Sequence, residues 1–167
     1  MPRELILIAH NVRSTHNVGS LLRTAEGLGV KKVYLTGYAP YPVSTDDHRL
    51  PHLAQKMHKQ IQKTALGAES LVAWSQQTDV LGLIKELKLA GYWMVALEQT
   101  PDAEAITSWK PPQKVAIIVG REVEGLEADV VNACDLTIEI PMFGQKESFN
   151  VVQAAAMALF YARFTNL

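Results

Sequence analysis

Hydrophobic residues along this chain follow two alternating patterns. Short, nearly continuous apolar runs are typical of strands buried on both faces of a parallel sheet. Between these runs, apolar residues recur every three or four positions, as on one face of a helix. The runs predict strands over residues 4–9, 32–36, 70–74, 92–97, 115–119 and 136–140.

The intervening segments predict helices over residues 17–29, 79–89, 126–133 and 150–164. Residues 37–50 read as a turn-rich loop, and residues 51–63 as at best a surface helix, because many of their side chains are polar. Alternating strands and helices predict an α/β fold: one domain over residues 1–167, with a mostly parallel sheet and helices on both faces.

Composition narrows the class of protein. With 48% hydrophobic and 20% charged residues, the chain has the make-up of a soluble globular protein. Its apolar runs are too short to cross a membrane or to form a signal peptide, which favours a cytoplasmic location. The single cysteine, Cys134, excludes an internal disulfide and a cysteine pair for a metal, so no metal is expected.

Charge is unevenly distributed along the chain. Residues 1–65 contain nine Lys or Arg against four Asp or Glu, together with all five histidines, whereas residues 66–167 contain seven against thirteen. Such asymmetry can mark a surface that faces a polyanion. It is weak evidence, because half of a chain is not one face.

The first candidate site is Asn17-Val18-Gly19, followed by Arg23. Asn17 would cap a helix, and Gly19 would allow close approach of a ligand or of backbone. Arg23 interrupts an apolar stripe, where a guanidinium is costly unless it is paired. The alternative is a plain helix cap with a salt-bridged arginine.

The second candidate is the acidic loop from Gly120 to Leu126, GREVEGL, directly after a predicted strand. It matches neither the dinucleotide fingerprint nor a Walker A loop. Its acids disfavour phosphate and would suit a cationic or hydroxyl-bearing ligand. The alternative is a solvated acidic turn.

The third candidate covers residues 140–159, IPMFGQKESFNVVQAAAMAL, in which Ser148 and Asn150 precede an apolar helix. The start of a helix leaves free N–H groups that can hold a ligand. Capping of those groups by Ser148 or Asn150 is the simpler interpretation. All three candidates follow predicted strands, at the edge where open α/β sheets bind ligands.

Together, N-x-G-x-x-x-R, G-x-E-x-x-G-L and I-P-M…S-F-N-V resemble, in this order, the three motifs of the SpoU/TrmH-type RNA methyltransferases of the SPOUT superfamily. The resemblance extends from Glu4 to about Ala162. It implies a C-terminal deep trefoil knot, a homodimer whose active site is completed across the interface, and S-adenosylmethionine held in the knot. The implied reaction is methyl transfer to a ribose 2′-hydroxyl of RNA.

The resemblance also assigns residues. Phe149 and Gln153 depart from the family pattern, but neither departure removes a reactive group. The implied cofactor-binding residues are Leu97, Gly120, Ile140, Met142 and Ser148. The implied catalytic residues are Asn17, Arg23, Glu124, Ser148 and Asn150.

Methyl transfer from a sulfonium depends mainly on placing the hydroxyl in line with the methyl carbon. The resemblance suggests that Arg23 helps to deprotonate that hydroxyl, but an arginine pKa above about 12 makes it a poor base, and anchoring a phosphate is easier. Asn17, Ser148 and Asn150 would orient Arg23, the ribose and the cofactor.

The RNA partner is expected to be tRNA more than rRNA, by analogy with minimal relatives. Two other functions stay open: an RNA-binding or assembly protein that has lost catalysis, and an ordinary doubly wound nucleotide-binding enzyme. The basic residues that could contact phosphates, or could simply form a solvated face, are Arg13, His16, Arg49, Lys56, His58 and Lys59.

Overall fold

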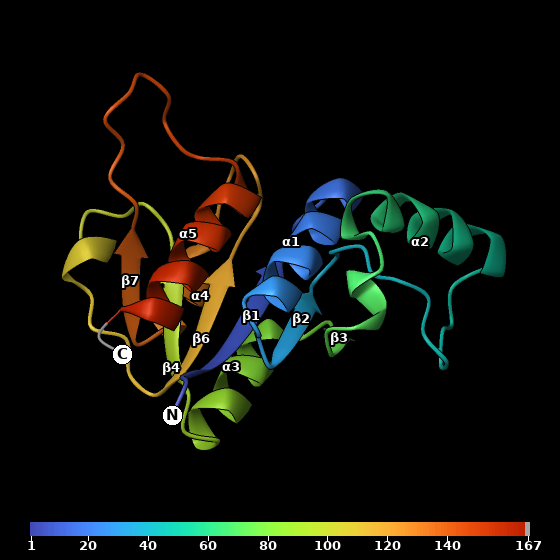
Figure 1. Cartoon of the computed structure of the whole chain (residues 1–167), viewed down its shortest axis with the longest axis horizontal. Helices are drawn as coiled ribbons and strands as arrows, with labels where there is room; N and C mark the ends of the chain where they lie inside the picture. Colours follow the sequence, from blue (N-terminus) through green and yellow to red (C-terminus); the bar gives the residue numbers. More distant parts are fainter. Residues whose placement is uncertain (166–167) are drawn as a thin grey trace.

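The computed structural model describes residues 1–165, which form an α/β fold around one seven-stranded sheet (Figure 1). The strand order is β3-β2-β1-β6-β4-β7-β5, and every pairing is parallel. The predicted parallel sheet is therefore confirmed. The strands are β1 (Glu4–His10), β2 (Lys32–Thr36), β3 (Trp74–Gln77), β4 (Trp93–Leu97), β5 (Glu104–Ala105), β6 (Lys114–Val119) and β7 (Leu136–Glu139).

Helices cover both faces of the sheet, as the sequence predicts. One buried cluster joins the sheet to α1 and α5, which pack against each other, and α2 packs on the outside of α1 (Figure 1). A second cluster joins the opposite face to α3 and α4. The helices are α1 (Thr15–Gly27), α2 (Pro51–Ala65), α3 (Val80–Leu89), α4 (Ala128–Ala133) and α5 (Val151–Phe164), with short 3-10 turns at Ala68–Ser70 and Ile106–Ser108.

The strand predicted over residues 70–74 is wrong. Residues 68–70 form a 3-10 turn, and β3 begins only at Trp74. The buried Glu69 accounts for the difference, because its carboxylate accepts the N–H of Gly67 and its carbonyl accepts the indole N–H of Trp74. The apolar residues from 71 to 73 therefore follow a turn and do not form a strand. The edge strand β3 consists of half-buried residues.

The loop over residues 37–50 is ordered by one arginine. The Arg49 guanidinium lies 3.6 Å from the ring centroid of Tyr41 and is paired with Asp47. It also donates to the carbonyl oxygens of Tyr41 and Pro42. The Arg49 guanidinium holds the pKa of the Asp47 carboxyl far below its usual range. This arrangement fixes the chain just before Pro51 begins α2, a position at which proline suits a helix.

The parallel register places the carboxyl ends of β1, β6, β4 and β7 along one edge of the sheet. The loops that follow these strands therefore lie together, and they include the second and third candidate segments. The first candidate, at the start of α1, follows β1 at the same edge. No helix in residues 1–165 combines the length and apolar character needed to cross a membrane.

Gly19 shows how closely α1 and α2 approach. A Cβ at this position would overlap the Ile61 carbonyl oxygen and the Thr64 hydroxyl, and would lie 2.9 Å from the Ala65 nitrogen. The close approach that the sequence suggests at Gly19 is therefore made by the backbone of α2. At Gly27, an added Cβ would meet no atom within 4 Å.

We expect Gly19→Ala to lower the free energy of unfolding by about 1–3 kcal/mol, because the backbone of α2 must move away. The matched variant Gly27→Ala should leave it unchanged or raise it by about 0.5–1 kcal/mol, because alanine has the higher helix propensity. Urea unfolding followed by circular dichroism measures both. Equal effects at the two positions would contradict the packing described here.

Candidate active site

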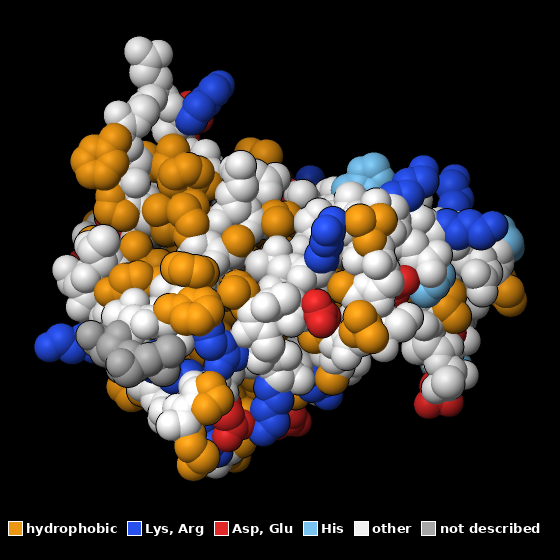
Figure 2. Space-filling view, viewed as in Figure 1, with side chains coloured by type: hydrophobic (Ala, Val, Ile, Leu, Met, Phe, Trp, Pro, Cys, Tyr) orange, Lys and Arg blue, Asp and Glu red, His pale blue; other side chains and the backbone are white. Residues whose placement is uncertain are grey.

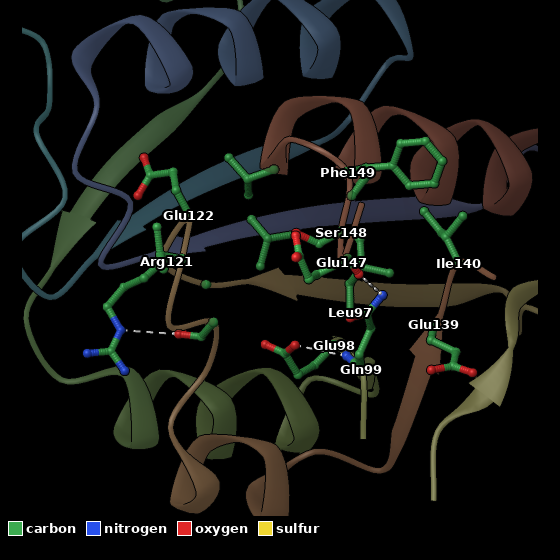
Figure 3. A pocket seen from close by; sticks show the side chains of 16 residues that line it. Leu97, Glu98, Gln99, Arg121, Glu122, Glu139, Ile140, Glu147, Ser148 and Phe149 are labelled. Carbon is green, nitrogen blue, oxygen red and sulfur yellow. Dashed lines mark hydrogen bonds between the residues drawn. The ribbon is translucent and has the colours of Figure 1, made fainter. Parts of the chain in front are cut away.

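A pocket lies at the carboxyl edge of the sheet, between three chain segments (Figure 3). The first is the end of β4, Leu97 to Gln99. The second is the loop after β6, from Val119 to Gly125. The third is formed by residues that follow β7 and open α5. The members of this third wall are Glu139, Ile140, Glu147, Ser148, Phe149, Val151 and Ala154.

The loop after β6 folds back on itself at two glycines. Arg121 and Gly125 exchange backbone hydrogen bonds of 3.3 and 3.1 Å, and Gly125 has a φ of +70°. A Cβ on Gly120 would lie 2.6 Å from the carbonyl carbon of Gly125, so only glycine fits beneath this turn. The tight loop leaves the acidic side chain of Glu122 at the pocket wall (Figure 3).

Glu98 and Gln99 tie the end of β4 to the other two walls. Glu98 Oε2 accepts the N–H of Leu126 at 2.8 Å, and its carboxyl carbon lies 2.9 Å from the place where a Cβ of Gly125 would stand. Gln99 Nε2 donates to the carbonyl oxygen of Glu147 at 2.9 Å. Sequence reasoning missed both residues, since neither belongs to a recognisable motif.

Glu122 connects the pocket to the start of α1. Its carboxylate accepts the backbone N–H of Ser14 at 3.1 Å, that of Arg13 at 3.3 Å, and the Asn17 side-chain amide at 3.1 Å. Burial acts to raise the pKa of Glu122, but these hydrogen bonds outweigh it and the pKa is lowered. Glu122 is also the glutamate in the third position of G-x-E-x-x-G, so the motif itself contained the signal for it.

Glu124, the expected catalytic glutamate, does not line the pocket. Its carboxylate pairs with the Arg13 guanidinium at 3.2 Å, and both side chains are exposed. Exposed pairs of this kind contribute little to stability. Of the two acids in the loop, the structure therefore places Glu122, and not Glu124, at the pocket.

Asn17 does not cap α1 as the sequence predicts. Ser14 is the cap, because its hydroxyl accepts the Asn17 N–H at 3.1 Å, and Asn17 lies in the first turn. Its side chain is free to donate to Glu122 and to accept a bond of 3.5 Å from the Asn150 amide. Asn150 itself caps α5 by accepting the N–H of Val152 at 2.8 Å, as predicted. Asn17, Glu122 and Asn150 thus link all three candidate segments.

The remaining expected residues separate into two groups. Leu97, Gly120, Ile140 and Ser148 all line the pocket. Met142 and Arg23 do not. Arg23 is exposed on α1, outside the apolar stripe, and within residues 1–165 it makes no side-chain hydrogen bond or ion pair.

A second polar cluster, which sequence reasoning also missed, joins the end of β1 to the loop after β6. The buried His10 ring lies 3.2 Å from Glu127 and 2.9 Å from the Thr36 hydroxyl, and Arg121 approaches Glu127 at 3.6 Å. Burial lowers the pKa of His10, although the Glu127 carboxylate opposes this. Among residues 1–165, no three His, Cys, Asp or Glu side chains are arranged to hold a metal ion.

We expect Glu122→Ala to lower the free energy of unfolding by about 1–3 kcal/mol at pH 7, because three donors lose their acceptor. The control Glu124→Ala should stay within about 0.5 kcal/mol of the unchanged protein. A lowered pKa stabilises the fold above the ordinary value of 4.5, and this stabilisation is lost as pH falls through the folded-state pKa. The cost of Glu122→Ala should therefore shrink in urea unfolding at pH 3. An equal cost at both pH values would contradict this role.

Curated relatives resemble most of this chain. One is the 23S rRNA (guanosine-2′-O-)-methyltransferase RlmB of Neisseria meningitidis, 30% identical over 155 residues, a match that covers 93% of this chain and 56% of the relative. Another is RlmB of Nitrosomonas europaea, 32% identical over 158 residues, with 93% and 54% coverage. The chain thus spans little more than half the length of these relatives.

A crystal structure of an AdoMet-bound rRNA methyltransferase from Sinorhizobium meliloti has the same fold, with a TM-score of 0.81 and 21% identity. The match covers 100% of this chain and 58% of that one. A family model described as the SpoU rRNA methylase family matches residues 4–160. Two motif segments line one pocket, the first is hydrogen-bonded to both of them through Asn17, and nearly the whole length is matched, so this chain belongs to the SpoU rRNA methylase family.

Proposed function

We propose that this protein transfers a methyl group from S-adenosylmethionine to a ribose 2′-hydroxyl of ribosomal RNA. One observation carries the proposal: the segments of all three motifs are joined through Asn17, Glu122 and Asn150 beside a single pocket. Both RlmB relatives are named for the same reaction class.

The chemistry of the pocket fits the proposed cofactor. Leu97, Gly120 and Ile140 offer apolar surface and close backbone approach, which suit a flat adenine ring. Several carboxylates offer acceptors for ribose hydroxyls and complement the positive charge of the sulfonium and amino groups. When bound, the cofactor supplies an activated methyl group. These carboxylates belong to Glu98, Glu122, Glu139 and Glu147.

In the proposed reaction the methyl group would pass from sulfur to the ribose 2′-oxygen, the electron pair of the broken carbon–sulfur bond would stay on sulfur as a neutral thioether, and the hydroxyl proton would pass to solvent water. Asn17, Ser148 and Asn150 would position the ribose by hydrogen bonds, and Glu122, in place of the expected Glu124, would hold the Asn17 side chain in position. Arg23 is exposed and charged, which suits an anchor for RNA phosphate more than a base. Met142 would contact the cofactor through its backbone, as the family resemblance implies.

The proposal includes a homodimer that completes the site, since Arg23 does not line the pocket of its own chain. The outer face of α5 supports a dimer: Phe160 and Phe164 are 57% and 52% exposed, and Met157 lies on the same stripe. The helix is apolar on both faces, which is typical of a buried helix. Figure 2 shows hydrophobic side chains gathered over this part of the molecule.

The proposal also includes the deep trefoil knot that the family resemblance implies. Glu147 accepts a hydrogen bond from Gln99 after β4, and residues 147–154 line one pocket together with the loop after β6, so the chain after β7 returns beside two earlier connections (Figure 3). Such a return is what a threaded C-terminal segment requires.

The names of the relatives favour ribosomal RNA over tRNA as the substrate to propose. The sequence led us to expect tRNA, but both RlmB relatives, at 30% and 32% identity, are named for 23S rRNA and for guanosine. We therefore propose a guanosine ribose in 23S rRNA as the acceptor, with tRNA as the competing substrate.

Methyl transfer is tested with methyl-labelled S-adenosylmethionine and unmodified transcripts of 23S rRNA and tRNA. We expect label at one 23S rRNA ribose, where the methyl group blocks alkaline cleavage of the backbone. Arg23→Ala should reduce kcat/KM for RNA by about 100-fold or more, because the ribose hydroxyl would no longer be held in line with the methyl group. Its cofactor affinity in calorimetry should be unchanged, and Lys110→Ala should behave like the unchanged protein.

Label in tRNA alone would contradict the rRNA assignment. Saturable cofactor binding without label in either RNA would favour the inactive RNA-binding function. Lost cofactor affinity in Arg23→Ala would contradict its placement at the RNA.

The dimer is tested by Phe160→Glu, which places a charge on the apolar face of α5. We expect the dissociation constant to rise by at least about 30-fold, as for an interface residue that contributes about 2 kcal/mol. Sedimentation velocity measures the change. The control is Leu89→Glu, on the opposite face of the sheet and 91% exposed, which should leave the dimer intact. A monomeric unchanged protein, or equal effects of the two variants, would contradict the proposed interface.

A further inference from the structure

The helix α2 carries a straight basic stripe on its outer face. His52, Lys56, Lys59 and Lys63 are all exposed and are spaced by four, three and four residues. At about 100° per residue, this spacing places them within roughly 60° of one another on the helix surface. The buried residues of α2, Ala54, Ile61 and Ala65, lie on the opposite side.

Within the described residues 1–165, no ion pair balances this charge. Residues 51–65 contain no Asp or Glu, and none of the ion pairs found in residues 1–165 involves a lysine of α2. Lys59 has like charges three residues before it and four residues after it, and each such pair destabilises a helix by roughly 0.2–0.5 kcal/mol. Figure 2 shows Lys, Arg and His side chains gathered along the edge of the molecule that α2 forms.

Arg23 and Lys32 make no ion pair in residues 1–165, but several other basic residues of the N-terminal half are held within the fold. Arg49 is enclosed by Asp47, Tyr41 and two carbonyl oxygens. His58 Nδ1 accepts the N–H of Val43 at 3.1 Å, and Arg13 pairs with Glu124. The charge asymmetry seen along the sequence therefore reduces, at the surface, mainly to the α2 stripe.

The position of α2 relates the stripe to the pocket. Thr64 of α2 donates to the carbonyl oxygen of His16 at 2.7 Å, and Gly19 packs against the backbone of α2. Both contacts are made by the first turns of α1, where Asn17 bonds to the pocket residue Glu122. An RNA strand that crosses α1 toward the pocket would therefore pass close to α2.

We propose that the stripe formed by His52, Lys56, Lys59 and Lys63 binds the phosphate backbone of the substrate RNA, away from the nucleotide that is methylated. The eleven helical steps from His52 to Lys63 rise by about 16 Å, enough to contact several phosphates. The three lysines supply sequence-independent affinity and orientation, which is the usual role of phosphate contacts. This inference rests on the proposed function, because it assigns the RNA of that reaction to one surface.

The test is the triple variant Lys56→Gln/Lys59→Gln/Lys63→Gln, whose substitutions lie on an exposed face and leave the helix packing intact. The control variant, Lys32→Gln/Lys85→Gln/Lys110→Gln, removes the same charge from residues that make no ion pair in residues 1–165. The probe is a fluorescein-labelled RNA hairpin transcribed from 23S rRNA, and anisotropy is measured between 50 and 200 mM KCl.

We expect the stripe variant to bind the hairpin at least about 10-fold more weakly at 100 mM salt. The slope of log K against log salt should fall by about two to three, close to one for each phosphate that the variant no longer neutralises. The control variant should change affinity by less than about threefold. Equal decreases in both variants would show a general charge effect and overturn the proposal, as would an unchanged slope in the stripe variant.

Failure of this inference can be distinguished from failure of the proposed function. If the stripe variant keeps its RNA affinity while the unchanged protein methylates 23S rRNA, only the assignment of the surface is wrong. If the unchanged protein methylates no RNA but the stripe variant loses affinity with the reduced slope, the surface holds and the catalytic function is wrong. When methyl transfer is measured over a range of RNA concentrations, the stripe variant should keep its kcat and show a raised KM for RNA.

Discussion

The carboxylate of Glu122 is the interaction on which the site depends. It accepts two backbone N–H groups at the start of α1 and the amide of Asn17, and it belongs to the loop after β6. Through Asn17 it reaches Asn150, the cap of α5. Three connections that are distant in sequence thus take one fixed arrangement. The hydrogen bonds to Glu122 also keep it ionised, since they lower its pKa despite partial burial.

Acidic and basic side chains gather on two different surfaces of the molecule, the acids at the pocket and many of the bases on α2. Four carboxylates, from Glu98, Glu122, Glu139 and Glu147, stand among the apolar residues of the pocket, which suits a cationic cofactor with hydroxyl groups and disfavours phosphate. One cation, Arg121, lines the pocket and lies near the carboxylate of Glu127, whereas the basic stripe on the outer face of α2 and Arg23 on α1 lie away from the pocket. A methyltransferase that acts on RNA needs both surfaces, one for the methyl donor and one for the polyanion. Keeping them apart prevents RNA phosphates and the cofactor from competing for the same groups.

Most of the fold could be predicted from periodicity, because buried parallel strands and amphipathic helices leave clear patterns. The apolar run at residues 70–74 predicted a strand, but this prediction is wrong because the hydrogen bonds of buried Glu69 form a turn that an apolar pattern does not indicate. The site was predictable in outline through its motifs. Asn17 was misread as a cap because Ser14, three residues earlier, takes that position. Glu98 left no signal, since its partner is a backbone N–H of Leu126 that only the folded loop presents.

The central claim is that the walls after β4, β6 and β7 form one cofactor site. Hydrogen–deuterium exchange with and without saturating S-adenosylmethionine tests it most directly, because exchange slows where a ligand orders the backbone. We predict slower exchange in three separate segments, residues 97–99, 119–126 and 139–152, with little change in α2. Protection confined to one of these segments, or centred on the loop around Arg49, would contradict the claim.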